Sequence, residues 1–186
     1  FRFYPEKDPI LWVKSAAEIL KRSEKVVFLL IGTGPMEEAI RELSRELGVQ
    51  DKMYMPGTEI NPVYPLTLMD VFMLTSLNEG TPNVVIEAQM CGVPVVSTEA
   101  GGVRGTVING ITGWIVKTRS KAAIADKVLE VLENGEWRAN AREHAMAHAE
   151  KSFSIERMIT DMLSVYGYDY ARTAVVTRKT PLTITS

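Results

Sequence analysis

A short run of small and polar residues, Gly-Thr-Pro-Asn, joins an apolar stretch to a segment with helical periodicity, and its residue types favour the binding of an anion. Gly80 lets the backbone approach a ligand closely. Thr81 is predicted to be the N-cap of the helix and Pro82 its first residue, where a proline loses nothing by lacking an N–H. The N–H groups of Asn83 and Val84 then stay free, and the helix dipole adds positive charge suited to a diphosphate.

Two carboxylates, Glu79 and Glu87, stand on either side of this run. Glu87 lies about five residues into the predicted helix, roughly 8 Å along its axis at about 1.5 Å per residue. A carboxylate accepts hydrogen bonds from two neighbouring hydroxyl groups, which a ribose presents on one side of a diphosphate and a hexose on the other. One motif can therefore hold both sugars. A plainer interpretation stays open, because solvated acids beside a turn at a helix start are common.

The order of elements along the chain shows what must position these residues. Strands are predicted at 26–31, 53–55, 71–74, 93–97 and 113–116, with a strand end at 1–5, a loop or broken helix at 62–65, and helices at 10–20, 36–47 and 82–90. From position 120 onward the periodicity predicts helices only, over 124–132, 137–150 and 155–166. Strands that alternate with helices predict an α/β fold with a parallel sheet covered by helices on both faces. Such sheets bind ligands at the carboxyl ends of their strands.

Other residues that could bind a ligand give weaker signals. Gly32 and Gly34 resemble the start of a dinucleotide fingerprint, but the third glycine is missing, so they are predicted to form a strand-to-helix turn near the nucleoside. His144 and His148 have a spacing that can bind a metal, yet no third ligand is evident, and solvated histidines are favoured. Cys91 follows an apolar helix and is predicted to be a small core residue. No metal site is expected.

The overall composition narrows the classes of function. Hydrophobic residues make up 46% of the 186 residues, which is typical of a folded domain. With a formal charge of −2 and a pI of about 5.8 the chain lacks a positive field, so nucleic-acid binding is not expected. A single cysteine is usual in a reducing compartment and predicts a cytoplasmic location. No apolar stretch reaches the roughly 18 residues that span a bilayer. The first residues look like the interior of a structure, as in a fragment.

The segment EGTPNVVIEAQMCGVPVVSTEAGG, which begins at Glu79, resembles the donor-site signature of family 4 glycosyltransferases of the GT-B fold. Further segments match the family in order and spacing: Arg2 with PEKDP at 5–9, FLLIGTGP at 28–35, and GITG at 110–113. The resemblance covers residues 1 to about 166. Two positions depart from the family pattern: Phe1 stands where a glycine often precedes the arginine, and Arg104-Gly105 replaces a frequent proline–glutamate pair.

The resemblance implies a fold and a set of domains. The fold would be α/β, a Rossmann-like parallel sheet with helices on both faces, forming the C-terminal half of a GT-B glycosyltransferase. Residues 1–166 would bind the nucleotide-sugar donor, and residues 167–186 would be a C-terminal tail. The acceptor domain would be N-terminal to this chain and absent from it.

The resemblance also implies roles for single residues. Arg2 and Lys7 match a basic pair that contacts the donor diphosphate and stabilises the charge on the departing nucleotide. Glu79 matches the carboxylate near the donor sugar, and these three residues would be the catalytic ones. Glu87 matches the residue that holds the ribose hydroxyls. Residues 80–84, with the two glycines of the 32–34 turn, would complete the donor site.

The activity implied is transfer of a sugar from a nucleoside-diphosphate sugar to an acceptor with retention of configuration, and with neither metal nor cofactor. No Asp-x-Asp pair, the usual metal–diphosphate anchor of the other large glycosyltransferase fold, occurs in the chain. The acceptor would be a glycan or a lipid-linked molecule bound through the N-terminal domain, with peripheral membrane association of the full-length enzyme at the inner face. The isolated fragment is expected to be inactive. Two alternatives stay open: a nucleotide-sugar-binding module without turnover, and part of a GT-B sugar epimerase.

Overall fold

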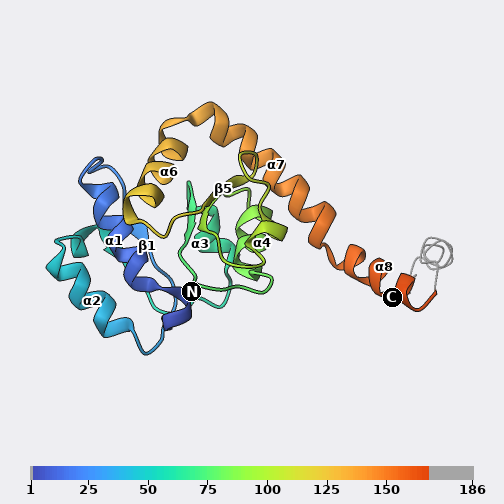
Figure 1. Ribbon diagram of the computed structural model, residues 1–186, viewed down its shortest axis with the longest axis horizontal. Coiled ribbons are helices and arrows are strands. Elements are labelled where there is room, and N and C mark those ends of the chain that lie inside the picture. The colour runs from blue at the N-terminus through green and yellow to red at the C-terminus, as the bar shows by residue number, and fades with distance from the viewer. Residues whose placement is uncertain (1, 168–186) are drawn as a thin grey trace, which may run out of the picture. The chain divides into compact units, whose positions relative to one another are not determined.

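The computed structural model describes residues 2–167 (Figure 1). The chain divides into two compact units, Phe1–Ala149 and Glu150–Ser186. In chain order the elements are η1 (Pro5–Lys7), α1 (Pro9–Leu20), β1 (Phe28–Leu29), α2 (Glu37–Glu46), η2 (Gln50–Lys52), β2 (Met53–Tyr54), α3 (Val63–Thr67), β3 (Phe72–Leu74), α4 (Asn83–Met90), β4 (Val95–Thr98), α5 (Val103–Thr106), β5 (Gly113–Val116), α6 (Lys121–Glu133), α7 (Gly135–Phe153) and α8 (Ile155–Val165). This alternation confirms the predicted α/β fold class.

All strand pairings among the described residues are parallel, but they form two separate sheets. One sheet pairs β1 with β2, and Phe28 stands opposite Met53. The other has the order β3-β4-β5, and Val95 of β4 stands between Phe72 and Gly113. The described strands are divided in this way because β1 and β3 do not pair with each other. The predicted strand end at residues 1–5 is reduced to one parallel bridge, between Arg2 and Thr33.

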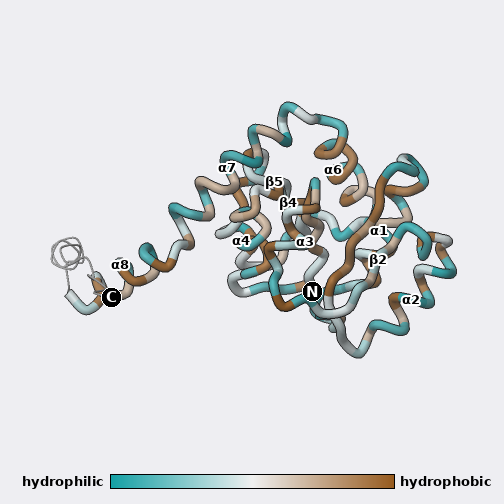
Figure 2. The backbone as a smooth tube through the Cα atoms, turned by 180° about the vertical axis from the view of Figure 1, so that it is seen from behind, coloured by the Kyte–Doolittle hydropathy of each residue, from teal (hydrophilic) through white to brown (hydrophobic). Residues whose placement is uncertain are grey.

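Helices cover both faces of the three-stranded sheet, as predicted. Met73 and Val96 belong to a core cluster with residues of α1 and α6. Their neighbours in sequence, Phe72 and Val95, belong to a second cluster with residues of α4 and α5. Successive side chains of a strand point to opposite faces, so each strand contributes to both clusters. In Figure 2 the interior strands are coloured as hydrophobic, whereas α2 is largely hydrophilic.

The start of α4 differs from the prediction by one residue. Pro82 is the N-cap, in an extended conformation with φ −75° and ψ 92°, and no side chain caps the helix. Thr81 is therefore not the N-cap, and Pro82 is not the first helical residue. A residue before a proline is disfavoured in the helical region, which keeps Thr81 outside the helix. The Pro82 carbonyl accepts hydrogen bonds from the N–H groups of Val85 and Ile86.

The other helices agree closely with the periodicity. Gly48, with φ 68°, ends α2 in the left-handed conformation that favours glycine. In the second unit, the Ser154 hydroxyl accepts a hydrogen bond from the Arg157 N–H and caps α8. The predicted tail at residues 167–186 lies outside the described residues, except for its first residue. No helix in the described part of the chain is long and apolar enough to cross a membrane.

Candidate functional site

A partly buried ion pair joins two of the residues predicted to be catalytic. Lys7 Nζ lies 2.6 Å from Glu79 Oε1, although the residues are 72 positions apart in the sequence. Their side chains are only 16% and 9% exposed. The Ser76 hydroxyl donates to the same Glu79 oxygen at 2.6 Å. A partly buried pair with a further hydrogen bond is held in one geometry far better than a surface pair.

The segment that carries Lys7 is tied down at its end by Asp8. This residue has φ 45°, and its side chain caps α1 by accepting a hydrogen bond from the Leu11 N–H at 3.0 Å. Its other carboxylate oxygen lies 2.5 Å from Arg119 Nη2. The Thr75 hydroxyl donates to the main-chain carbonyls of Lys7 and Asp8. The turn before α1 is therefore anchored to the end of β3.

Arg119, in the loop after β5, connects the ends of three elements. Its guanidinium donates to the carbonyls of Thr75 and Ser76 at 2.8 Å each, and to the Thr98 hydroxyl at 3.3 Å, besides pairing with Asp8. It thereby links the start of α1 to the ends of β3 and β4. Arg119 could not be predicted from the sequence, because a lone arginine after a strand carries no recognisable pattern. The Asp-Pro pair before α1 was a capping signal that could have pointed to Asp8.

Two glycines after β4, Gly101 and Gly102, pack closely against the loop that contains Glu79 and Gly80. The Gly102 N–H donates to the Glu79 carbonyl at 2.9 Å. A Cβ added to Gly102 would lie 1.4 Å from the Gly80 carbonyl oxygen, and one added to Gly101 would lie 2.5 Å from the Glu79 carbonyl oxygen. The double glycine is therefore required for this backbone contact. Gly80 itself has no neighbour within 4 Å of an added Cβ, so there is open space on its outer side.

The first turn of α4 presents free donors beside this loop. Within the described residues, the N–H groups of Asn83 and Val84 have no hydrogen-bond partner, because they precede the first helical hydrogen bond. Asn83 is exposed, so these groups are accessible from solvent. The positive end of the helix dipole acts at the same place. Although the N-cap prediction was wrong, the expected pair of free N–H groups is present.

Glu87 lies one turn further along α4 and lines a cavity of about 910 Å³. Asn83 and Val84 line the same cavity, together with Glu59 and Leu66 from the region of α3. Neither Lys7 nor Glu79 is among the lining residues. The predicted residues thus fall into two groups, a hydrogen-bonded loop and the wall of a cavity, which the start of α4 connects.

The remaining predicted site residues are Arg2, Gly32 and Gly34. The Arg2 guanidinium lies 5.8 Å from the centre of the Tyr4 ring, and the structure does not bring it into the Lys7–Glu79 pair. Gly34 is needed for packing, because an added Cβ would lie 2.7 Å from the Phe3 carbonyl oxygen. The Gly32 N–H donates to the carbonyl of Gly57 at 2.7 Å. Donor contacts by Arg2 and these two glycines stay predictions.

Cys91 and the two histidines show no chemistry of their own. Burial raises the pKa of the Cys91 thiol, and the negative charge of Glu87 raises it further, so the thiol stays protonated at neutral pH. His144 is exposed, and its ring nitrogen Nδ1 lies 2.7 Å from the Asn140 carbonyl. Among the described residues, no group of three acidic, histidine or cysteine side chains is placed to hold a metal ion.

Comparison with known proteins gives one family and several similar structures. A sequence profile of the family described as Glycosyl transferases group 1 matches residues 1–148. The Vi polysaccharide biosynthesis protein VipC/TviE of Salmonella typhi is 34% identical over 163 residues, which cover 86% of this chain and 28% of that protein.

Solved structures show the same fold at lower identity. TarM of S. aureus, in a variant form in complex with fondaparinux, alpha-GlcNAc-glycerol and UDP, superposes with a TM-score of 0.84 at 21% identity, covering 90% of this chain and 34% of that one. Alr3699/HepE of Anabaena in complex with UDP gives a TM-score of 0.80 at 22% identity, covering 89% and 47%. The chain therefore spans less than half the length of each of these proteins.

Proposed function

This chain belongs to the group 1 glycosyl transferases, and on that premise we propose that residues 1–166 bind a nucleoside-diphosphate sugar as the C-terminal half of a retaining GT-B enzyme of family 4. The observation that carries the proposal is the partly buried Lys7–Glu79 pair, in the loop that leads to the free N–H groups at the start of α4. Cations and free helix donors together form an anion site. The UDP bound to TarM and HepE supports a nucleoside diphosphate as the ligand.

Lys7 can bind a phosphate without leaving Glu79. Its ammonium group has three donors, and the contact with Glu79 uses one of them. The remaining donors of Lys7 and the N–H groups of Asn83 and Val84 are assigned to donate hydrogen bonds to the diphosphate oxygens. When the bond between the sugar and the phosphate breaks, negative charge grows on the departing phosphate. Lys7, which Glu79 holds in place, is assigned to stabilise that charge together with Arg2 and the start of α4.

The two glutamates hold the sugars on either side of the diphosphate. One oxygen of Glu79 already accepts hydrogen bonds from Lys7 and Ser76. Its second oxygen is assigned to a hydroxyl of the donor sugar. Glu87, half-buried on the wall of the cavity, is assigned to the ribose hydroxyls. This division follows the order of the ligand, which is sugar, diphosphate and ribose.

The acceptor side of the reaction is assigned to polypeptide outside this chain. A glycan or a lipid-linked molecule is the proposed acceptor, with the full-length enzyme cytoplasmic and peripherally associated with the inner face of a membrane. The isolated chain would bind donor without turnover. Neither a metal nor a cofactor is assigned a role in binding or transfer.

The proposal is tested by calorimetric titration of this chain with UDP, GDP and their sugar conjugates, with and without EDTA. We expect at least one of these ligands to bind, with an affinity that EDTA leaves unchanged, because the assigned partners of the diphosphate are side-chain cations and main-chain N–H groups. Absence of binding by the whole panel contradicts the donor site. Binding that is lost with EDTA and restored by Mg²⁺ or Mn²⁺ contradicts the metal-free assignment.

A further inference from the structure

A glutamine is fully buried near the end of α4, two residues after Glu87. The Gln89 side chain is 0% exposed. Its helix neighbours Val85 and Ala88 belong to the core cluster that also contains Val103 of α5. Burying an amide in a core costs free energy unless its polar atoms are hydrogen-bonded. Packing alone would therefore favour an apolar residue at this position.

The Gln89 amide binds the end of α5. Its Nε2 atom donates a hydrogen bond of 2.7 Å to the carbonyl of Thr106, 17 positions away in the sequence. Thr106 is the last residue of α5, where a carbonyl has no partner inside the helix. Because a carbonyl oxygen can only accept, the amide nitrogen must be the atom that faces it. Gln89 thus caps α5 from a neighbouring helix.

The other end of α5 contacts the candidate donor site. Gly102 is the N-cap of α5, and its N–H donates to the Glu79 carbonyl at 2.9 Å. An added Cβ on Gly102 would lie 1.4 Å from the Gly80 carbonyl oxygen, so the two segments touch. Because α5 has only four residues, it spans roughly 6 Å at about 1.5 Å per residue. A shift at Thr106 therefore reaches Gly102 over a single helical turn.

Two contacts close a ring of main chain beside the site. One joins Gly80 to Gly102 at the start of α5, and the other joins Thr106 at the end of α5 to Gln89. Helix α4 completes the ring, because it runs from Asn83, shortly after Gly80, to the turn that carries Gln89. The free N–H groups in the first turn of α4 belong to this ring. Opening either contact would let that turn and the loop before it move relative to α5.

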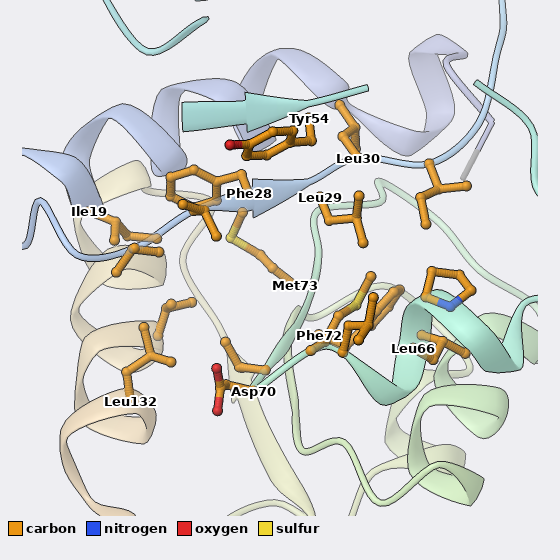
Figure 3. Close-up of a pocket in the computed structure, with 18 of the residues that line it drawn as sticks. Ile19, Phe28, Leu29, Leu30, Tyr54, Leu66, Asp70, Phe72, Met73 and Leu132 are labelled. Carbon is orange, nitrogen blue, oxygen red and sulfur yellow. The ribbon is translucent and has the colours of Figure 1, made fainter. Parts of the chain in front are cut away.

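Apolar side chains pack α4 against α5 and α3. Leu66 and Phe72, which line the cavity in Figure 3, belong to the same core cluster as Val85 and Val103. Apolar contact is non-directional, so it holds helices together without fixing how they are aligned. A hydrogen bond, by contrast, requires a narrow range of distance and direction. The Gln89 amide therefore determines how α5 lies along α4.

We propose that Gln89 is a positioning residue of the donor site. By holding the end of α5, it keeps Gly102 against the loop of Glu79 and Gly80 and fixes that loop relative to the free N–H groups of α4. Gln89 does not touch the ligand itself, since it is fully buried and is not among the residues that line the cavity. The expected effect on ligand binding rests on the proposed function, whereas the effect on Gly102 requires no ligand.

Substitution by methionine tests the proposal, because methionine has a similar size and cannot donate a hydrogen bond. We expect amide hydrogen exchange at Gly102 to be about fivefold faster in Gln89→Met, as for the loss of one neutral hydrogen bond. Calorimetry should show UDP binding at least about threefold weaker, because a displaced loop no longer aligns with the ligand.

Ser44→Ala is the matched control, because it removes another buried hydrogen bond, from the Ser44 hydroxyl to the Ile40 carbonyl at 2.6 Å, in α2. It should destabilise the fold without changing exchange at Gly102 or UDP affinity. Gln89→Glu provides a rescue. Burial raises the pKa of a carboxyl group, so at about pH 5 the new side chain is protonated and donates to Thr106, whereas ionisation by about pH 8 removes that donor. Relative to the parent chain, this variant should therefore behave normally only in acid.

Equal exchange at Gly102 in Gln89→Met and Ser44→Ala would overturn the proposal, because Gln89 would then only fill the core. Faster exchange with unchanged UDP affinity would overturn it as well, since the loop would move without consequence for the ligand. If the parent chain binds no nucleoside diphosphate, the proposed donor site fails, while faster exchange in Gln89→Met alone would still support the hold of Gln89 on Gly102.

Discussion

The two parts of the candidate site are built differently. Around Lys7 and Glu79, hydrogen bonds from Ser76, Thr75 and Arg119 hold the side chains and the backbone. The first turn of α4, by contrast, presents unpartnered N–H groups beside a cavity. The first part is organised in advance, as the stabilisation of developing charge requires. In the second part, the hydrogen bonds are completed only by the ligand. Substitutions in the first part should therefore change the free energy of unfolding, whereas substitutions in the second should change ligand affinity.

The largest effect is expected in the pre-organised part, from Gly102→Ala. The residue has φ −65°, which alanine tolerates, but the new Cβ would lie 1.4 Å from the Gly80 carbonyl oxygen. The loop must then move, which should lower the free energy of unfolding by about 3 kcal/mol and weaken UDP binding. Gly105→Ala is the matched control, because an added Cβ there has no neighbour within 4 Å. Similar urea unfolding curves for the two variants would contradict the contact.

A smaller loss is expected from Arg119→Ala. The change removes donors from the carbonyls of Thr75 and Ser76 and leaves Asp8 without its cation. Because hydrogen bonds of charged groups contribute about 1.5 to 3 kcal/mol, the free energy of unfolding should fall by about 2 kcal/mol. Arg45→Ala, which removes an exposed pair with Glu38, should change it by less than about 0.5 kcal/mol. Equal stability of both variants in urea titrations would show that Arg119 does not anchor the site.

The smallest effect is expected where the ligand completes the site. Glu87→Ala should weaken binding of UDP by about 1.5 kcal/mol, the lower end of the range for a hydrogen bond to a charged group, because Glu87 is only half-buried. It should weaken binding of 2′-deoxy-UDP much less, since that compound already lacks one of the two ribose hydroxyls. Calorimetry on both proteins with both ligands shows how much the substitution reduces the preference for ribose over deoxyribose. If the variant still prefers ribose as strongly as the parent chain, Glu87 does not hold the ribose.

Much of the fold could be predicted from local patterns. The periodicity of α2 and its stop at Gly48 are encoded within a dozen residues, and the alternation of strands and helices implies a parallel sheet. The predicted N-cap of α4 was wrong by one residue. Threonine is a common N-cap residue type, but the conformation of Thr81 is set by the following proline. The break between β1 and β3 could not be predicted, because strand pairing is a property of distant segments.

The residues of the candidate site also divide into those that a local pattern predicts and those that only the structure reveals. Glu79, Gly80 and Glu87 could be identified because they belong to one continuous motif. Arg119 could not, because its hydrogen-bond partners, on Asp8, Thr75, Ser76 and Thr98, are distant from it in the sequence. Gly101 and Gly102 stood out in the sequence, but their purpose, contact with the backbone of Glu79 and Gly80, is visible only in the structure.

The central claim is that Lys7 binds the donor diphosphate while paired with Glu79. Its most direct test is calorimetric titration of UDP into the parent chain, Lys7→Met and, as a matched control, Lys14→Met, which changes an exposed lysine on α1. Loss of a charge-assisted hydrogen bond, about 1.5 to 3 kcal/mol, predicts an affinity roughly 10- to 150-fold lower for Lys7→Met in low salt, a smaller loss in high salt, and no change for Lys14→Met. Equal UDP affinity of Lys7→Met and the parent chain in low salt would contradict the claim.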